Sequence, residues 1–453
     1  MIKSKYYLII FDVLLAFVSL VCAYLIGFKD VKSLNMLIGG GLIRIFCYLI
    51  VVFLVSYFLD LYNYRMFVSR RLVVQRVLLA TFVSFLILSA FFYMFPSLRF
   101  WRNIFALVLI FYGSGQIGIR LLIRKFASAS IFSNRIFIIG AGDLAQSIAK
   151  IIPEDDNIHS YVRFIACTTK DPVVDPELIV GHIDNISELV HDYQPQKIVI
   201  ALSERRGNLP LNKLMRSKLR GIEILDATTY YEQVKECLLI ENMQPSVFIY
   251  TQRFRMTTFM RSYKRVFDIF FSGFGLTVTA PFFPLIAIMI KLDSTGPVFF
   301  KQLRVGENEI EYFVYKFRTM AQDAEDETGA VWAQKDDPRV TKIGSFMRKT
   351  RIDEIPQLIN VLKGDMSFIG PRPERMPFVD RLNESIPFYS TRHLVKPGVT
   401  GWAQVCYPYG ASDEDALEKL RYDLFYIKNY SIILDFRIIL DTVRVVLSGF
   451  GGR

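Results

Sequence analysis

The sequence predicts a membrane protein of the α plus α/β class, with an all-helical N-terminal region, a parallel-sheet domain and a mainly helical C-terminal domain. Hydrophobic residues make up 52% of the 453 residues and charged residues only 21%, which is more apolar than soluble proteins of this size are. The apolar residues are also unevenly distributed. Long apolar runs fill the first quarter of the chain, and alternating strand and helix patterns follow them.

Four apolar runs are predicted to be transmembrane helices and to form a first region, residues 1–125. They are Tyr6–Phe28, Leu37–Leu59, Val77–Phe95 and Phe100–Ile123. About 20 residues at ~1.5 Å per residue cross the ~30 Å hydrocarbon layer of a bilayer. Each run reaches that length, and the first is expected to be retained because no convincing cleavage site follows it.

The distribution of Lys and Arg predicts the orientation of these helices, because cytoplasmic loops carry the excess of both. One side holds Lys3, Lys5, Arg65, Arg70, Arg71, Arg76, Arg124 and Lys125, and the other holds Lys29, Lys32, Arg99 and Arg102. Everything after residue 125 is therefore expected on the cytoplasmic side. The net charge of +11 suits an anionic bilayer or substrate, and no nucleic-acid-binding motif is present, so no nucleic-acid partner is expected.

A parallel-sheet domain is predicted for residues 130–245. The stretch "NRIFIIGAGDLAQSIAK" runs from an apolar strand through Gly140-Ala-Gly142-x-x-Ala145 into a helical pattern, as in the first unit of a Rossmann-like domain. The strands "RFIACTT", "KIVIAL" and "GIEILD" follow. The second strand does not end in the acidic residue that holds a ribose. A scaffold or regulatory role is therefore favoured over a dinucleotide site.

An apolar run at about residues 266–291 is predicted to enter the membrane and leave on the same side. Pro281 and Pro284 lie in its middle, where proline removes a helical N–H and bends the helix. Both flanks are basic, with Lys264 and Arg265 before it and Lys291 after it. The positive-inside bias draws both ends to one face. A fifth, kinked span is the alternative.

Two adjacent carboxylates, Asp353 and Glu354, lie in the basic stretch "RKTRIDEIPQLINVLKGDMSFIGPRPE". Pro356 is tolerated only in a first helical turn, so the carboxylates are expected at or just before a helix N-terminus. Such an end favours anions. Because adjacent helical residues point about 100° apart, the two carboxylates suit separate tasks. One would attack a phosphorus atom, and the other would hold Mg²⁺.

Cationic and polar side chains around this pair are candidate substrate ligands. Lys316 and Arg318 are two residues apart in "YKFRTM", and Arg372 belongs to a Gly- and Pro-rich loop that would fix its guanidinium for phosphate. The turn "KPGVTGWAQV" would bring backbone N–H groups close to a ligand. Trp402 and Gln404 belong to this turn. The acidic segment Asp323–Asp337 is most simply a solvated loop.

Residues 261–453 resemble the bacterial sugar transferase family, the monotopic polyprenyl-phosphate sugar-1-phosphate transferases. The resemblance rests on "KRVFDI", "IKLDSTGPVFFKQLRVG", "YKFRTM", "RKTRIDEIPQL", "GDMSFIGPRPE", "PGVTGWAQV" and "YDLFYIKNYS", in this order. The four spans and the Rossmann-like domain before them are similar to the large members that start exopolysaccharide, capsule or O-antigen synthesis.

This resemblance implies a catalytic C-terminal domain that transfers sugar 1-phosphate from a UDP-sugar to undecaprenyl phosphate at the cytoplasmic face of the bacterial inner membrane, with UMP as the other product. It implies that Asp353 is the nucleophile and that Glu354 holds Mg²⁺. It implies phosphate binding by Lys316, Arg318, Arg348 and Arg372, and with a UDP-sugar as donor Trp402 and Gln404 are candidate uridine contacts. The family's membrane hairpin breaks at Ser-Pro, whereas this chain has Ala280-Pro281. The proline keeps the bend, without the serine hydroxyl.

Two other functions are weighed. A membrane-tethered UDP-sugar dehydratase would share the spans and the Rossmann-like unit, but it needs Tyr and Lys of a YxxxK motif on one helix. Pro195 opposes a helix from Tyr193 to Lys197. A non-catalytic scaffold of a polysaccharide assembly would not depend on Asp353. The sequence selects no sugar, although glucose and galactose are favoured, and a homodimer through the Rossmann-like domain is a hypothesis.

Overall fold

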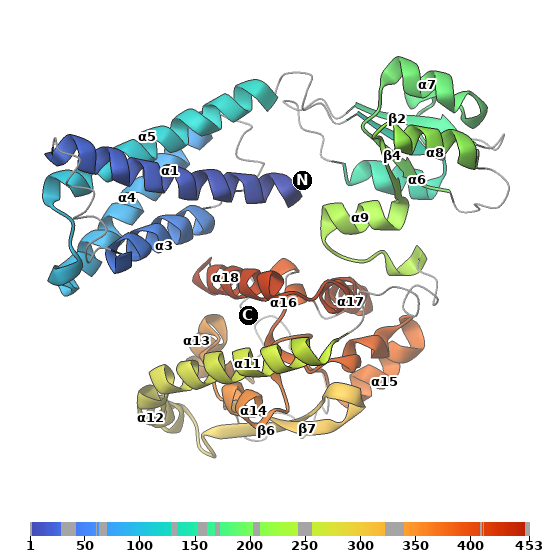
Figure 1. Cartoon of the computed structure of the whole chain (residues 1–453). Helices are drawn as coiled ribbons and strands as arrows, with labels where there is room; N and C mark the ends of the chain where they lie inside the picture. The colour runs from blue at the N-terminus through green and yellow to red at the C-terminus, as the bar shows by residue number, and fades with distance from the viewer. Residues whose placement is uncertain are drawn as a thin grey trace. The chain divides into compact units, whose positions relative to one another are not determined.

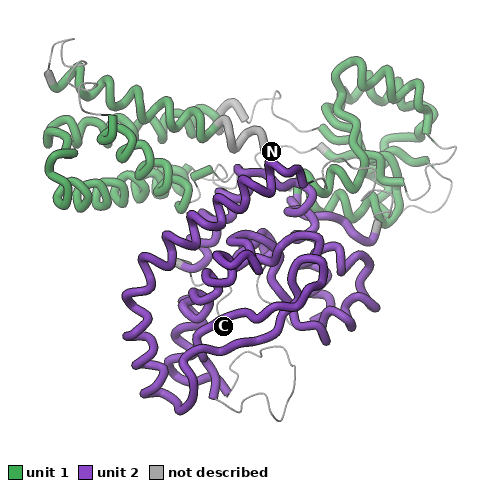
Figure 2. The backbone as a smooth tube through the Cα atoms, turned by 60° about the horizontal axis from the view of Figure 1, so that its bottom comes forward, with its two compact units in different colours: residues 1–234 green, residues 235–453 purple. Residues whose placement is uncertain are grey.

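The computed structural model describes residues 2–28, 42–59, 61–62, 70–127, 135–152, 161–167, 173–202, 209–242, 256–321, 339–407, 410 and 412–448. The chain divides into two compact units, residues 1–234 and 235–453 (Figure 2). This division falls eleven residues before the expected end of the sheet domain at 245, so residues 235–242 belong with the C-terminal unit.

Four apolar helices form the N-terminal region (Figure 1). They are α1 (Ile2–Phe28), α3 (Leu42–Phe58), α4 (Arg70–Met94) and α5 (Arg102–Ala127), with the short 3₁₀ helix η2 (Pro96–Leu98) between the last two. Helices α1, α4 and α5 are each long and apolar enough to cross a membrane, whereas the described part of α3 is a shorter apolar helix of 17 residues. Four predicted apolar helices are thus confirmed.

A buried ion pair links α1 to α5 inside this bundle. Arg120 donates to both carboxylate oxygens of Asp12, with N–O distances of 3.0 and 2.7 Å. Gln116 donates to the same carboxylate at 3.0 Å and to Tyr112 Oη at 2.7 Å. Charged side chains in an apolar bundle must be paired, because their desolvation is costly. This network therefore fixes the register of the two helices.

A five-stranded parallel sheet occupies the rest of the first unit, in the order β3-β2-β1-β4-β5. Its strands are β1 (Arg135–Ile139), β2 (Tyr161–Ala166), β3 (Ile179–His182), β4 (Lys197–Ile200) and β5 (Glu223–Asp226). The helices α6 (Asp143–Lys150), α7 (Ile186–Tyr193) and α8 (Leu211–Leu219) lie between successive strands, together with the 3₁₀ turns η4 (Pro176–Leu178) and η5 (Ile183–Asn185), and α9 (Ala227–Lys235) follows β5. The predicted parallel sheet with helices is confirmed.

The first turn of this sheet is tightly packed. Gly140 has φ +123°, and a Cβ there would lie 2.5 Å from the Ala201 carbonyl oxygen, so only glycine fits. The backbone N–H of Val173 donates to the Ala141 carbonyl, so a later segment of the chain crosses this turn. Tyr193 ends α7 and Lys197 begins β4. The two residues therefore do not share a helix, as the YxxxK chemistry of a dehydratase would require.

The second unit starts with two helices joined at a bend. Helix α11 (Thr258–Thr279) leads through the 3₁₀ turn η8 (Ala280–Phe282) into α12 (Phe283–Asp293). Figure 1 shows α12 turning away from the axis of α11. The first half of α11 buries Lys264, Phe267 and Asp268 against the unit, whereas Phe270, Phe274 and Phe282 further along are more than half exposed. Apolar side chains without protein cover are typical of contact with lipid.

The two cations at the start of this hairpin are bound to the protein. Lys264 donates to Tyr426 Oη at 2.9 Å and lies 3.6 Å from Asp435. The Arg265 guanidinium donates to the carbonyls of Val361 and Leu362, at 2.6 Å each. Both side chains therefore hold α11 onto the unit rather than pointing toward lipid headgroups.

The remaining elements of the second unit form a core around Trp402, Leu424 and Ile438. The strands are β6 (Phe299–Val305), β7 (Glu311–Phe317), β8 (Ser367–Ile369) and β9 (Gly398–Thr400). The helices are α13 (Lys342–Thr350), α14 (Gln357–Lys363), α15 (Met376–Ser385), α16 (Trp402–Cys406), α17 (Asp413–Lys428) and α18 (Ile432–Ser448). The 3₁₀ turns are η6 (Ile240–Asn242), η9 (Glu307–Glu309), η10 (Ile352–Glu354) and η11 (Tyr389–Leu394). Strands β6 and β7 pair antiparallel, and β8 and β9 pair parallel.

Candidate active site

The two adjacent carboxylates line a cavity of about 530 Å³. Asp353 and Glu354 end the 3₁₀ turn η10 and are each 7% exposed. Helix α14 begins three residues later at Gln357, with Pro356 immediately before it. The predicted position just before a helix N-terminus is therefore confirmed.

The turn between α13 and the carboxylate pair contains one residue with a left-handed backbone conformation. Arg351 ends α13 and begins η10 with φ +59°. A non-glycine residue in this region is strained, and such strain persists where the surrounding structure enforces it. Before this turn, α13 packs closely against Thr319. A Cβ on Gly344 of α13 would lie only 2.1 Å from the Thr319 carbonyl oxygen.

Glu354 binds cationic side chains of the site. Its Oε1 accepts from Lys316 Nζ at 2.9 Å and from Arg372 Nη2 at 2.6 Å, and it lies 3.9 Å from Arg351 Nη1. Burial alone would raise its carboxyl pKa, but Arg372, Lys316 and Arg351 outweigh burial and hold that pKa well below its ordinary value. Glu354 is therefore ionised throughout the physiological range.

Asp353 has a different environment. Its Oδ1 is buried and accepts no hydrogen bond from any residue that the structure describes. Burial and the neighbouring negative charge of Glu354 raise the pKa of the Asp353 carboxyl to about 6, against the opposing effect of Lys316 and Arg351. This carboxylate is therefore ionised at neutral pH, yet it keeps an oxygen without a protein partner. That combination suits a nucleophile.

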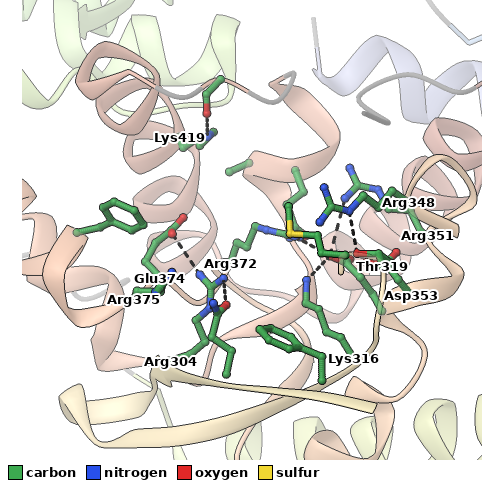
Figure 3. A pocket seen from close by; sticks show the side chains of 18 of the residues that line it. Arg304, Lys316, Thr319, Arg348, Arg351, Asp353, Arg372, Glu374, Arg375 and Lys419 are labelled. Atoms are coloured by element: carbon green, nitrogen blue, oxygen red, sulfur yellow. Dashed lines mark hydrogen bonds and ion pairs between the residues drawn. The ribbon is translucent and has the colours of Figure 1, made fainter. Parts of the chain in front are cut away.

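The predicted cations reach the cavity from separate elements. Lys316 is on β7, and its ammonium pKa is lowered by burial, an effect that Glu354 opposes. Arg348 comes from the last turn of α13, and its Nε donates to Thr319 Oγ1 at 3.0 Å. Arg372 follows β8. Figure 3 shows Arg348, Arg351 and Asp353 on one side of the cavity, with Glu374 and Arg375 on the other.

Arg318 also lines the cavity, but its guanidinium is bound elsewhere. Its Nη atoms donate to the carbonyls of Thr295 and Ser294 at 2.6 and 2.8 Å and to Ser294 Oγ at 3.0 Å. Those residues follow α12 directly. Arg318 therefore ties the end of the membrane hairpin to the site, and this geometry favours a positioning role over phosphate binding.

Gln404 lines the cavity, whereas Trp402 does not. The Trp402 ring is 2% exposed, and its indole N–H donates to the Glu236 carbonyl at 2.9 Å. Arg437 lies 4.7 Å from the ring centroid and forms an ion pair with the Glu236 carboxylate. Trp402 is therefore a core residue that holds segment 235–242 in place, and the expectation of a uridine contact from it is wrong.

The glycines of "KPGVTGWAQV" serve backbone packing. A Cβ on Gly398 would lie 2.1 Å from the Gly370 N atom, and one on Gly401 would lie 2.1 Å from the Gly370 oxygen. The Gly398 N–H donates to the Pro371 carbonyl at 2.8 Å. This turn therefore packs against the loop of Arg372, and the Gly398 N–H is not available to a ligand because it already donates to Pro371.

Sequence reasoning missed the residues that hold these groups in position. Asn360 joins α14 to β7, since its side chain donates to the Phe313 carbonyl at 2.7 Å and accepts from the Tyr315 N–H at 3.1 Å. Arg392 donates to the Arg372 carbonyl at 2.9 Å and to Asp423 at 2.8 Å. A polar residue inside the apolar run "LINVL" was a detectable signal for Asn360. No sequence spacing indicates the Arg392–Asp423 pair.

The comparisons with known proteins concern this second unit. The sequence model of the bacterial sugar transferase family matches residues 259–449. A protein of Aeromonas hydrophila named UDP-N-acetylgalactosamine-undecaprenyl-phosphate N-acetylgalactosaminephosphotransferase is 49% identical over 190 residues, which are 42% of this chain and 45% of the relative. The Escherichia coli UDP-glucose:undecaprenyl-phosphate glucose-1-phosphate transferase is 41% identical over 185 residues, 40% of each chain.

A shorter relative is matched almost completely. The exopolysaccharide production protein PSS of Rhizobium leguminosarum bv. phaseoli is 46% identical over 185 residues, which are 40% of this chain and 92% of the relative. The match spans less than half the length of the Aeromonas and Escherichia proteins. From residue 259 onward, where the cavity and its carboxylate pair lie, the chain belongs to the bacterial sugar transferase family.

Proposed function

We propose that this protein transfers sugar 1-phosphate from a UDP-sugar to undecaprenyl phosphate and releases UMP, as the first membrane step of exopolysaccharide, capsule or O-antigen synthesis. The observation that carries the proposal is the buried carboxylate pair with opposite environments. Glu354 is ion-paired with Lys316 and Arg372, and Asp353 keeps an unpartnered oxygen in a cavity lined by cations. The names of the relatives support the same reaction.

The reaction follows from these groups in two displacements. An Asp353 carboxylate oxygen attacks the phosphorus that bears the sugar, and the bond from that phosphorus to the UMP oxygen breaks. UMP leaves with the electron pair, and the sugar phosphate is held on Asp353. A phosphate oxygen of undecaprenyl phosphate then attacks the same phosphorus and displaces the carboxylate. Each step conserves charge, and the second step regenerates the free Asp353 carboxylate.

The cations provide the electrostatic part of catalysis, because charge accumulates on the phosphoryl oxygens during transfer. Lys316, Arg348 and Arg372 line the cavity together with Asp353. The Glu354 carboxylate keeps Lys316 and Arg372 oriented before substrate binds. Preorganisation of this kind avoids the cost of arranging charged groups during the reaction.

The carboxylate pair also fits Mg²⁺. This ion is commonly bound by one or two carboxylates together with substrate phosphates, and the unpartnered Oδ1 of Asp353 lies next to Glu354. Across the described residues, no group of three or more His, Cys, Asp or Glu side chains is placed to hold a metal. Glu354 would therefore bind an ion that arrives with the diphosphate, where Mg²⁺ would neutralise phosphate charge.

The hairpin of α11 and α12 would place this cavity at the cytoplasmic surface of the inner membrane. Its bend at Ala280-Pro281 lies between exposed apolar residues, and Arg318 binds the carbonyls that follow α12. A re-entrant hairpin would let a soluble UDP-sugar and a lipid-borne phosphate meet in one cavity. The freed backbone groups at the bend would be covered by protein or water.

The remaining domain organisation is also proposed. Residues 1–125 would be a four-helix transmembrane region, 130–245 a Rossmann-like domain with a scaffold or regulatory role, and 261–453 the catalytic domain. The strand order β3-β2-β1-β4-β5 supports the Rossmann-like assignment. A homodimer through that domain would be tested by native mass in detergent, where a monomer would refute it.

The proposed function is tested by the nucleotide product. Purified full-length protein is incubated with undecaprenyl phosphate, Mg²⁺ and a panel of UDP-sugars that includes glucose, galactose and N-acetylgalactosamine. Release of UMP is expected, and the sugar that gives it identifies the donor. Release of UDP would mean ordinary glycosyl transfer and would exclude Asp353 as the nucleophile.

A further inference from the structure

The side chain of Gln404 is unusual among the residues that line the cavity. Both its Nε2 and its Oε1 are shielded from solvent, and neither has a hydrogen-bond partner among the residues that the structure describes. A buried amide without partners costs free energy, so such a group requires an explanation. A bound ligand that satisfies both atoms is one.

The chemistry of the amide restricts that ligand. The Oε1 atom accepts hydrogen bonds, and the Nε2 atom donates them. An ionised phosphate offers acceptors only, so it would leave Oε1 facing negative charge. A ligand with a donor and an acceptor side by side satisfies both atoms. The imide edge of a uracil ring has this pattern, because its N–H lies between two carbonyls.

The wall of the cavity that contains Gln404 also contains an aromatic ring. Tyr407 also lines the cavity, and it follows α16 directly with an extended backbone. Its hydroxyl donates to Asp415 Oδ1 at 2.9 Å, and Asp415 accepts from the N–H and hydroxyl of Ser412 at the start of α17. The ring is thus tethered, and it offers a face on which a planar base can stack.

Helix α16, which carries Gln404, is itself held rigidly. The indole N–H of Trp402 donates to the Glu236 carbonyl, and Arg437 clamps the Glu236 carboxylate through two hydrogen bonds of 2.7 and 2.8 Å. Gly401, which immediately precedes Trp402, packs directly against Gly370, two residues before Arg372. The wall is therefore preorganised beside the loop that carries a phosphate-binding candidate.

We propose that Gln404 and Tyr407 form the nucleobase subsite of the cavity, where Gln404 pairs with the imide edge of uracil and Tyr407 stacks on the ring. This inference rests on the proposed function, which supplies a UDP-sugar as the donor. It assigns a base-binding role to the wall formed by α16 and leaves the phosphates to Lys316, Arg348 and Arg372.

The test separates the base from the phosphates and the sugar. Isothermal calorimetry on the purified full-length protein with Mg²⁺ measures the affinity for UMP and for inorganic pyrophosphate. Gln404→Ala and the isosteric Gln404→Glu are each expected to weaken UMP binding about tenfold, because both lose the amide donor. Pyrophosphate affinity should stay within about twofold of wild type. Tyr407→Ala should weaken UMP binding by a similar factor.

Gln302→Ala is the matched control. Gln302 is a second glutamine of the cavity wall, but its Oε1 already accepts from Arg304 Nε and Nη2 at 3.0 and 2.6 Å. It should leave UMP affinity unchanged. Thermal unfolding of each variant checks that the fold is retained, and Gln404→Glu provides a second variant of native shape.

Two results would overturn the inference. Unchanged UMP affinity in both Gln404 variants would exclude the base contact. An equal loss for UMP and pyrophosphate would indicate a phosphate or structural role. Failure of the wild type to release UMP from any UDP-sugar would refute the proposed function, while UMP binding would still test the subsite.

Discussion

The pKa of Asp353 makes a quantitative prediction for the first displacement. Burial and the charge of Glu354 raise that pKa to about 6. In the proposed reaction the carboxylate attacks and the carboxylic acid does not, so the rate is expected to follow the ionised fraction and to be lost as the pH falls through 6. That fraction is about 91% at pH 7 and about 9% at pH 5, which predicts a roughly tenfold slower reaction at pH 5.

An aspartate at its ordinary pKa of 3.8 would behave differently. It would be about 94% ionised at pH 5, and the rate would hardly change over the same range. The two cases therefore differ by about a factor of ten at one accessible pH. This makes the measurement decisive, provided that only the first displacement is observed.

The assay is a rapid-quench measurement of UMP formed in a single turnover, with excess enzyme, the identified UDP-sugar and no undecaprenyl phosphate. Leaving out the lipid removes a phosphate monoester that itself titrates near pH 6. Glu354→Gln provides the matched perturbation. Removal of the neighbouring negative charge should lower the pKa of Asp353 and move the acidic midpoint to lower pH, whatever the remaining rate. A wild-type rate that is constant from pH 7 to pH 5 would refute the reasoning.

Three further predictions follow from other contacts. Asp353→Asn should reduce UMP release by at least about a thousandfold with unchanged protein level, and full activity would remove it as the nucleophile. Asp423→Asn leaves the Arg392 guanidinium buried without the Asp423 carboxylate, so we expect a loss of about 3 kcal/mol in unfolding free energy. We also expect slower UMP release, because Arg392 donates to the Arg372 carbonyl. Denaturant unfolding and activity check both. Asp12→Asn should likewise lower the unfolding temperature of the bundle in detergent. The double variant Asp12→Asn with Arg120→Gln should recover part of the lost unfolding temperature. An unchanged unfolding temperature in the single variant would contradict the role of this pair.

The sequence determined where the chemistry lies. Two adjacent carboxylates before a proline that opens a helix can lie only at a helix start, since the ring of Pro356 would clash further along. The structure has Asp353 and Glu354 there. Apolar run length likewise indicated the N-terminal helices, and the alternation of strands and helices indicated the parallel sheet, because both depend on local periodicity and on the thickness of a bilayer.

Tertiary structure alone decided what each side chain does. Arg318 and Arg372 look equivalent in the sequence. Arg318 nevertheless binds carbonyls of the residues that follow α12, whereas Arg372 binds Glu354. Trp402 and Gln404 are two residues apart, and one enters the core while the other enters the cavity. Such choices depend on contacts between residues that are distant in the chain, such as Trp402 with Glu236.

The different acidities of Asp353 and Glu354 have the same origin. Two adjacent carboxyl groups have nearly the same local sequence environment, so the sequence cannot separate them. Lys316 and Arg372, 38 and 18 residues from Glu354, converge on one of its oxygens and leave Asp353 Oδ1 without a partner. The sequence determined which residues are candidates for phosphoryl chemistry, and the tertiary structure decided their different environments, because electrostatic effects depend on distances and burial that only the tertiary structure sets.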